Sequence, residues 1–252
     1  MMQKDTRLSG RSALVTGSTG GLGVAIAKEL AAQGAFVVVS GRNQSHGEAV
    51  VADIEVAGGR AAFVAADLGA GADEIHRAAA TATEASGGRL DILVNNAASL
   101  QLPTPTGEVT AQTLRDAFEV NVFAPFLLTG IIAPQMASGG AIVNIGSITG
   151  LRGASGSAVY NASKAAIHSF TTSWADEFGP FGVRVNAVAP GPISTERQEE
   201  FAEHIAPVLS RLPSRRMSTP QEVAAAVAFL ASDDASNIHG AILSVDGGWA
   251  AV

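Results

Sequence analysis

Seven short apolar runs, rich in β-branched residues, alternate along the chain with longer segments of helical pattern. The apolar runs predict strands at 12–16, 35–40, 61–66, 90–94, 140–146, 183–188 and 241–245. The intervening patterns predict helices at 22–33, 45–57, 72–86, 110–136, 158–178 and 220–231. Because the runs are continuously apolar, both faces of each strand must be covered. We therefore expect an α/β fold: a doubly wound, mostly parallel seven-stranded sheet flanked by helices on both faces.

The composition excludes several classes of function. No cysteine occurs, which excludes disulfides and thiolate chemistry, and the five histidines are too scattered to predict a metal site. The net charge of −7, without a run of Lys or Arg, argues against nucleic-acid and membrane partners. The apolar segment 120–137 has polar and proline interruptions, which indicates a buried helix rather than a membrane span. No linker or repeat divides residues 1–252, so we expect a single domain in a cytoplasmic protein.

A glycine-rich turn, TGSTGGLG, follows the first predicted strand at residues 16–23. Ligands of such sheets bind beyond the carboxyl ends of the strands. Glycines at 17, 21 and 23 permit a tight turn, and the free amides of the next helix suit a pyrophosphate. The spacing differs from GxGxxG, and the P-loop lysine is missing. These residues alone therefore fit both a dinucleotide-binding loop and a simple packing turn.

The second predicted strand ends at Ser40 and is followed by Gly41, Arg42 and Asn43. A carboxylate near this position would hold the ribose hydroxyls of NAD(H), but none is present. The planar guanidinium of Arg42 can instead bind a ribose phosphate. We therefore expect NADP(H) to be preferred, although a surface arginine at the start of a helix would look the same.

The chain contains one tyrosine, Tyr160, and Lys164 lies four residues later, on the same face of a predicted helix. Ser147 closes the predicted strand 140–146, thirteen residues before the tyrosine. A phenol can give a proton to the alkoxide formed when hydride reduces a ketone. We expect the ammonium and an oxidised nicotinamide to lower the phenol pKa from about 10, and Ser147 to hold the substrate oxygen. The three residues thus predict a hydride-transfer enzyme.

These motifs resemble the short-chain dehydrogenase/reductase family in its compact branch, which has a Rossmann-type fold. The resemblance rests on TGxxxGxG, on NNAA at 95–98 where the family has NNAG, and on the Ser, Tyr and Lys spacing. It extends over almost the whole chain and implies a catalytic set of Asn121, Ser147, Tyr160 and Lys164. In the family, the matching Asn bends its helix and holds a water that links the lysine to solvent.

The resemblance also implies a set of cofactor contacts at the strand ends. They are Gly17, Ser18, Thr19, Gly21, Leu22, Gly23, Arg42, Asn43, Asp67, Leu68, Asn95, Ala97, Tyr160, Lys164, Pro190, Gly191, Ile193 and Thr195. In this reading Asp67 contacts the adenine, while Ile193 and Thr195 bind the carboxamide. Without the resemblance, Asp67 is a turn residue, and the asparagines at 95 and 96 brace the loop. Members with a similar Gly-Arg accept both cofactors, so NAD(H) remains an alternative.

The remaining expectations concern substrate and assembly. Residues 194–216 predict a helical lid, or else a solvated amphipathic helix. The inner side of the lid would present Phe201, Ile205, Val208 and Leu209. The expected pocket walls are Ser99, Leu100, Leu102, Ile148, Leu151 and Arg152. These walls are mainly apolar and favour a ketone or secondary alcohol, with Arg152 as the one charge available to an anionic substrate. The apolar content and the family-like tail at 246–248 imply a homotetramer.

Three functions are compatible with the glycine-rich turn. The leading one is an NADP(H)-preferring oxidoreductase that interconverts a small-molecule ketone and a secondary alcohol. A 3-oxoacyl-thioester (acyl-carrier-protein) reductase shares every motif, but the acidity of this chain disfavours an acidic carrier protein. A non-catalytic dinucleotide-binding sensor would not need the intact set of Ser147, Tyr160 and Lys164.

Overall fold

The computed structural model describes residues 6–196 and 202–252. Seven strands form one sheet in which every pairing is parallel, in the order β3-β2-β1-β4-β5-β6-β7. The strands are β1 Ser12–Val15, β2 Phe36–Gly41, β3 Arg60–Ala65, β4 Ile92–Asn95, β5 Ala141–Ile145, β6 Arg184–Pro190 and β7 Ile242–Val245. The predicted α/β fold is confirmed, and each predicted strand overlaps an observed one.

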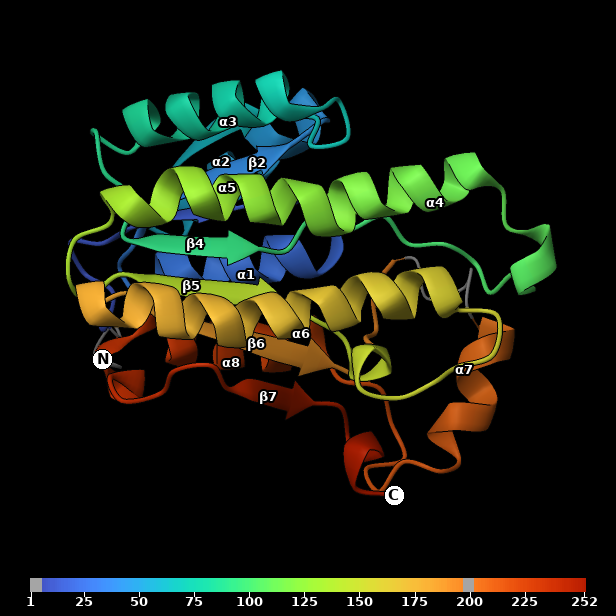
Figure 1. Cartoon of the computed structure of the whole chain (residues 1–252). Coiled ribbons are helices and arrows are strands. Elements are labelled where there is room, and N and C mark those ends of the chain that lie inside the picture. Colours follow the sequence, from blue (N-terminus) through green and yellow to red (C-terminus); the bar gives the residue numbers. More distant parts are fainter. Residues whose placement is uncertain (1–5, 197–201) are drawn as a thin grey trace.

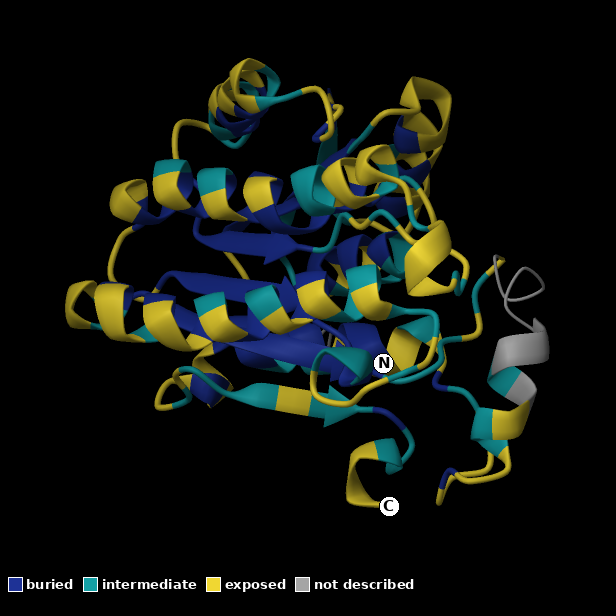
Figure 2. Ribbon diagram, turned by 45° about the vertical axis from the view of Figure 1, so that its right-hand side comes forward, coloured by how far each residue is buried: buried dark blue, intermediate teal, exposed yellow. Residues whose placement is uncertain are grey.

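Helices cover both faces of this sheet (Figure 1). They are α1 Gly21–Ala32, α2 Gln44–Val56, α3 Ala72–Ala85, α4 Ala111–Phe118, α5 Ala124–Ile132, α6 Ala158–Phe178, α7 Ala202–Leu209 and α8 Pro220–Ala231. Successive strand residues point to opposite faces, so Ala13 and Val15 pack with α1 and α8, whereas Leu14 packs with α3 and α5. The central strands β1, β4, β5 and β6 are buried, whereas β7 at the sheet edge is partly exposed (Figure 2).

The segment from α4 to α5 forms one long helical run, interrupted by a π-helical turn at Glu119–Phe123. By length and composition alone, Ala111–Gln135 could cross a membrane, and half of its most apolar window is buried within the protein. The buried side chains include Leu128 and Ile132, which belong to the core between α3, α5, α6 and the sheet. This burial matches the prediction of a core helix.

The strand order places the chemistry. The chain moves outward from β1 to β3 on one side, then returns to β4 on the other side of β1. The helices that follow β1 and β4 therefore diverge onto opposite faces, leaving a crevice at the carboxyl ends of these strands. The loops after β1, β2, β4, β5 and β6 all open toward this edge (Figure 1).

Candidate active site

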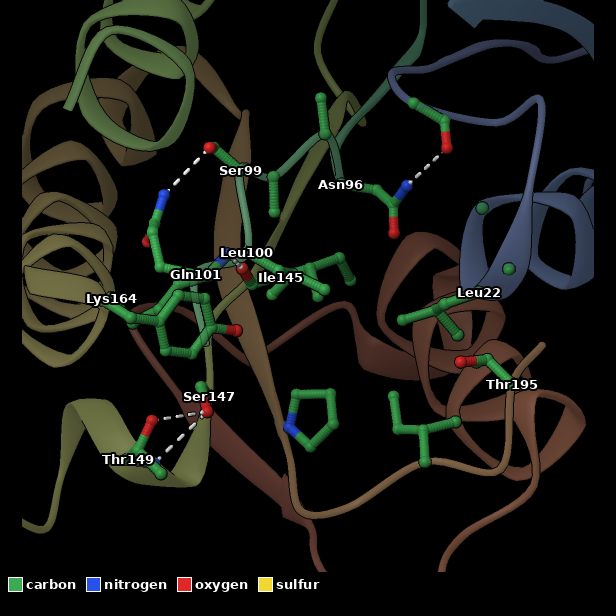
Figure 3. Close-up of a pocket in the computed structure, with 18 of the residues that line it drawn as sticks. Leu22, Asn96, Ser99, Leu100, Gln101, Ile145, Ser147, Thr149, Lys164 and Thr195 are labelled. Atoms are coloured by element: carbon green, nitrogen blue, oxygen red, sulfur yellow. Dashed lines mark hydrogen bonds between the residues drawn. The ribbon is translucent and has the colours of Figure 1, made fainter. Parts of the chain in front are cut away.

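A pocket of about 900 Å³ lies at this edge of the sheet. Its walls come from the ends of six strands, each represented by one residue here: Gly17, Arg42, Asp67, Asn96, Ser147 and Pro190. Segments far apart in the sequence thus line one cavity, and Figure 3 shows side chains from several of them pointing into it. Its size is at the upper end of ordinary ligand sites and suits a large ligand with a smaller one beside it.

The glycine loop after β1 is packed so closely that two glycines are obligatory. Gly17 has a φ of +62°, and a Cβ there would lie 2.8 Å from the Cα of Ala97. A Cβ on Gly23 would lie 2.2 Å from the carbonyl oxygen of Gly17. Asn96 fixes the turn, because its Nδ2 donates to the carbonyl oxygens of Thr16 at 2.8 Å and Gly17 at 3.1 Å. Asn96 therefore braces the loop, as its residue type predicted.

Two residues predicted to contact a cofactor point elsewhere. Ser18 is fully buried, with its hydroxyl donating to Val15 O at 2.7 Å and accepting from Ser40 N at 2.9 Å. Asn95 also turns inward, and its Nδ2 donates to Asn144 Oδ1 at 2.8 Å. Neither residue lines the pocket. The side chains of Ser18 and Asn95 therefore join the loop and the sheet together, and cofactor contacts at these two residues stay a prediction.

The other predicted residues of the glycine loop line the pocket. These are Gly17, Thr19, Gly21, Leu22 and Gly23. Thr19 also borders a second, shallower hollow together with Arg42 and Asn43. The hollow adjoins the main pocket near the start of α2, because Thr19 and Arg42 border both.

The two residues after β2 have different environments. Arg42 is exposed, and among residues 6–196 and 202–252 its guanidinium has no hydrogen bond or ion pair. Asn43 is the N-cap of α2, with Oδ1 accepting from His46 N at 3.0 Å. The Asn43 side chain is thus already engaged, while the guanidinium of Arg42 is available to a ligand.

The end of β3 supplies Asp67 and Leu68, which both line the pocket. Asp67 Oδ1 accepts from Gly69 N at 3.1 Å and so stabilises the turn, and its own N–H donates to Glu74. The structure therefore places Asp67 in both of the positions that the sequence allowed, as a turn residue and as a pocket wall.

Ser147, Tyr160 and Lys164 meet in the pocket. Ser147 lies two residues after the end of β5, whereas the other two lie on one face of α6, one turn apart. Lys164 is buried, with its Nζ 5.7 Å from the centre of the Tyr160 ring and donating to Ile145 O at 2.8 Å. Figure 3 labels Ser147 and Lys164 among the side chains that line this pocket. Strand β5 and helix α6 thus bring a hydroxyl, a phenol and an ammonium into one place.

Burial dominates the pKa values of the phenol and the ammonium. It raises the pKa of Tyr160 to about 12, and the hydrogen bond from Ser147 opposes this in part. Burial also lowers the pKa of Lys164 to about 8. The expected fall of the phenol pKa also requires an oxidised nicotinamide, and it stays a prediction. At neutral pH its own groups hold Tyr160 protonated, which is the form that donates a proton.

Asn121 lies in the π-helical turn, nearly inaccessible to solvent. Its Oδ1 accepts from Ser99 N at 2.7 Å, and its Nδ2 donates to Ser99 O at 3.0 Å and Ser163 Oγ at 3.1 Å. The π turn is the helix distortion that the resemblance implied. Asn121 thus ties the loop after β4 to α6 next to Lys164, and its proposed water contact stays a prediction.

The last residue of β6 and the segment after it supply four predicted pocket residues: Pro190, Gly191, Ile193 and Thr195. Gly191 is tightly packed, since a Cβ there would lie 2.8 Å from Asp246 Cα. Next to Thr195, the Glu196 carboxylate accepts from the backbone N–H of Gly21 at 2.8 Å. This contact joins positions 175 residues apart, and no local sequence signal predicted it.

The predicted substrate walls are partly corrected. Ser99, Leu100 and Ile148 line the pocket, but Leu102, Leu151 and Arg152 do not. The guanidinium of Arg152 instead donates to the backbone oxygens of Trp249 and Val252, so it holds the C-terminal end of the chain. Trp249 also lines the pocket, and no local sequence signal predicted this.

The predicted lid contributes two of its four inner residues. Ile205 and Val208 of α7 line the pocket, whereas Leu209 does not. Phe201 lies outside the described residues. The lid itself stays a prediction.

Comparisons with known proteins agree with this geometry. A family model described as enoyl-(acyl carrier protein) reductase matches residues 17–250. Cyclopentanol dehydrogenase from Comamonas testosteroni is 40% identical over 253 residues, covering 97% of this chain and 99% of the relative. The structure of a short-chain dehydrogenase/reductase from Serratia marcescens BCRC 10948 has a TM-score of 0.92 at 36% identity, covering 97% of this chain and 99% of that one.

A third match has a ligand in its description. It is a blue fluorescent protein from a metagenomic library, solved in complex with NADPH, with a TM-score of 0.91 at 35% identity. It covers 97% of this chain and 99% of that one. With the sheet order, the glycine turn and the Ser, Tyr and Lys group on one pocket, these matches decide the family. The chain belongs to the short-chain dehydrogenase/reductase family and is an oxidoreductase acting on CH–OH groups.

Proposed function

We propose that this enzyme interconverts a ketone and a secondary alcohol by hydride transfer, with Tyr160 as the acid and base and with NADP(H) as the preferred cofactor. The observation that carries this proposal is the convergence of Ser147, Tyr160 and Lys164 on a pocket that also contains the glycine turn. The similarity to a cyclopentanol dehydrogenase supports a small ketone or alcohol as substrate.

The pocket fits a dinucleotide. Gly17 and Gly23 allow the glycine turn to pack without a Cβ, and the turn and the start of α1 line the pocket, where the free amides of the helix would suit a pyrophosphate. Asp67 and Leu68 border the end of the pocket toward β3, while Ile193 and Thr195 border the side toward β6. When bound, a nicotinamide would supply or accept the hydride.

The residues of this chain would handle the proton and the substrate oxygen. In reduction, Tyr160 gives its proton to the nascent alkoxide, and its raised pKa keeps that proton available. Ser147 binds and orients the same oxygen by donating a hydrogen bond. Lys164 lies under the phenol ring, where its charge stabilises the phenolate left behind. In oxidation the same groups act in reverse.

The cofactor preference rests on Arg42. It follows a strand that ends without a carboxylate, and its guanidinium borders both the main pocket and the shallow hollow. A ribose phosphate placed there would gain a planar donor group. The related NADPH complex supports this preference.

The experiment is a panel of cyclic, aliphatic and aromatic ketones and alcohols, assayed with both cofactors by nicotinamide absorbance. We expect turnover of at least one cyclic or aliphatic pair, faster with NADP(H). Tyr160→Phe should lower turnover by about a thousandfold while cofactor binding is kept, since it removes only the proton donor. Retained turnover in Tyr160→Phe would disprove the acid-base role. Cofactor binding without turnover in the wild type would favour the sensor.

A second candidate is a 3-oxoacyl-thioester reductase, because a structure described as a putative betaketoacyl-ACP reductase is similar to this chain, with a TM-score of 0.87 at 43% identity. Acetoacetyl thioesters in the same panel distinguish the two functions. The apolar walls at Leu100 and Ile148 favour the simple ketone.

We also propose that the protein is a cytoplasmic homo-oligomer, with a tetramer as the expected state. Phe123 and Phe126 are about half exposed on the long helical run. Phe126 continues into a ring cluster with Phe170 and Trp174 of α6. Exposed aromatic residues gathered on adjoining helices are typical of a protein interface.

A further inference from the structure

The hydroxyl of Ser147 is surrounded by donors. Ser147 is the N-cap of a short 3₁₀ turn, Ile148–Gly150, and its Oγ accepts from Thr149 N at 3.2 Å. The hydroxyl of Thr149 lies 3.0 Å from the same oxygen. Both contacts are drawn in Figure 3. The distances alone leave open which of the two hydroxyls donates.

Asn161 decides the direction. It follows Tyr160 on α6 and reaches back to the 3₁₀ turn. With its amide nitrogen facing Thr149, it donates to Thr149 Oγ1 at 3.0 Å and to Ser157 O at 3.2 Å. Its Oδ1 then accepts from Ala154 N at 3.1 Å. Only this orientation satisfies both ends of the amide, because the opposite one faces oxygen to oxygen and nitrogen to nitrogen.

The remaining protons then have one consistent arrangement. Thr149 Oγ1 already accepts from Asn161, and within the described chain its only other polar neighbour is Ser147. Its single proton therefore goes to Ser147 Oγ. Ser147 then accepts two hydrogen bonds, from the N–H and the O–H of Thr149, which fills both lone pairs. The proton of Ser147 must point away from Thr149, into the pocket.

We propose that Asn161 and Thr149 are positioning residues that make Ser147 an obligate hydrogen-bond donor to the reacting oxygen of the substrate. The inference rests on the proposed ketone–alcohol function and deepens it. A donor-only Ser147 favours an oxygen that gains negative charge, as the carbonyl oxygen does on reduction. Each donor in the chain also polarises the next, so Ser147 becomes a stronger donor.

The first test compares Thr149→Val with Thr149→Ser. The valine keeps the shape and the backbone N–H but removes the hydroxyl, whereas serine retains it. We expect Thr149→Val to lower kcat about tenfold with little change in KM, a fraction of the loss from deleting an oxyanion donor outright. Thr149→Ser should restore kcat to within about twofold. Thr172→Val is the matched control, because it removes an exposed α6 hydroxyl that donates to Ser169 O.

The second test reverses the direction of the hydrogen bonds from Asn161 through Thr149 to Ser147. In Asn161→Asp, the oxygen that accepts from Ala154 can be kept, but the group facing Thr149 becomes an acceptor. The proton of Thr149 would then turn to the carboxylate, and the proton of Ser147 would turn to Thr149. We expect kcat to fall further than in Thr149→Val. Adding Thr149→Val to Asn161→Asp should recover activity, because it removes the acceptor that draws the Ser147 proton away. A pure charge effect of the new carboxylate would persist in the double variant.

A readout independent of turnover uses the single tyrosine. After a rapid jump to alkaline pH, near-ultraviolet tyrosinate absorbance measured before unfolding reports Tyr160 alone. Thr149→Val should ionise to a smaller extent than the wild type, and Ser147→Ala to a smaller extent still. Greater ionisation in Thr149→Val than in the wild type, or an unchanged kcat in folded Thr149→Val, would overturn this inference and leave the proposed function standing. Absence of any ketone or alcohol turnover in the wild type would remove the proposed function and this inference with it.

Discussion

The function of an individual side chain in this protein depends on whether neighbouring residues pair its charge or its hydrogen-bonding groups. The guanidinium of Arg42 is available to a ligand, because no described residue binds it, whereas the side chain of the next residue, Asn43, caps α2. Tyr160 stays protonated because burial outweighs the hydrogen bond from Ser147. His168 is a third case: it is buried on α6, one turn after Lys164, and neither ring nitrogen has a hydrogen-bond partner among the described residues.

The environment of His168 predicts a pH-dependent stability. Burial, and to a smaller extent the Lys164 charge, lowers the pKa of His168 to about 4, against about 6.5 when unfolded. Between these values the unfolded chain binds a proton that the folded chain excludes. The free energy of unfolding should therefore fall as pH drops through this window, by about 2 kcal/mol between pH 7.5 and pH 5.

Urea unfolding at the two pH values measures this effect. His168→Leu should lose less stability on acidification than the wild type, although packing against Gly146 and Gly150 changes its absolute value. His76→Leu is the control, because His76 is exposed on α3, and this variant should keep the wild-type dependence of stability on pH. An equally steep loss in His168→Leu would mean that other groups dominate acid unfolding.

Arg42 predicts a change in cofactor discrimination. Arg42→Ala should weaken NADP(H) binding by about ten- to a hundredfold, since a hydrogen bond to a charged group contributes about 1.5–3 kcal/mol. NAD(H) binding should change little, because that cofactor has no phosphate at this position. Fluorescence titration of both reduced cofactors checks this, and equal losses for both would contradict the phosphate role.

At the scale of elements, loops join helices and strands that local sequence does not relate. The loop after β6 reaches the N-terminus of α1, where the Glu196 carboxylate accepts from Gly21 N. That amide belongs to the set proposed to face a pyrophosphate. A carboxylate there repels a second anion, although it stabilises the positive end of the helix dipole.

Glu196→Gln should therefore tighten cofactor binding about two- to fivefold, the size of one charge at a helix terminus. The measurement is the dissociation constant of the reduced cofactor at low ionic strength. The effect should shrink as salt is added. Glu55→Gln is the control, because Glu55 is exposed near the C-terminal end of α2, where the chain leads into the start of β3 and away from the pocket. Weaker binding in Glu196→Gln would show that the carboxylate orders the loop for the cofactor instead.

At the scale of the whole molecule, one sheet keeps two apolar cores apart, and aromatic residues remain uncovered on one side. The core with α3, α5 and α6 continues outward through Phe170 to the exposed ring of Phe126. The helices α5 and α6 run side by side on this face (Figure 1). The apolar layer thus extends past what one chain can bury.

The exposed face predicts assembly through these helices. Phe123→Glu should dissociate the oligomer toward monomer, because a charge buried in an interface without a partner is strongly unfavourable. Phe123 has no ring contact in its own chain among the described residues, so the fold should be kept. Light scattering coupled to size exclusion measures the mass. Phe181→Glu, at an exposed residue after α6, is the matched control. An unchanged mass in Phe123→Glu would place the interface elsewhere.

The sequence by itself determined the features that depend on neighbouring residues. The alternation of apolar runs and helical patterns predicted the sheet, the spacing of glycines predicted the turn at Gly17, and the i, i+4 spacing predicted that Tyr160 and Lys164 share a face. Such features follow from backbone geometry within a few residues, so they can be read without the fold.

The tertiary structure decided which way each side chain of a motif points. Asn95 and Asn96 are adjacent and of one type, yet the first joins β4 to β5 and the second braces the glycine turn. Successive strand residues face opposite sides, so the motif cannot assign both to the pocket. Likewise, the guanidinium of Arg152 binds the backbone of Trp249 and Val252, about a hundred residues away. The pocket is therefore lined by Trp249 and not by the charge of Arg152. Contacts at that separation arise only when the strands are ordered in the sheet.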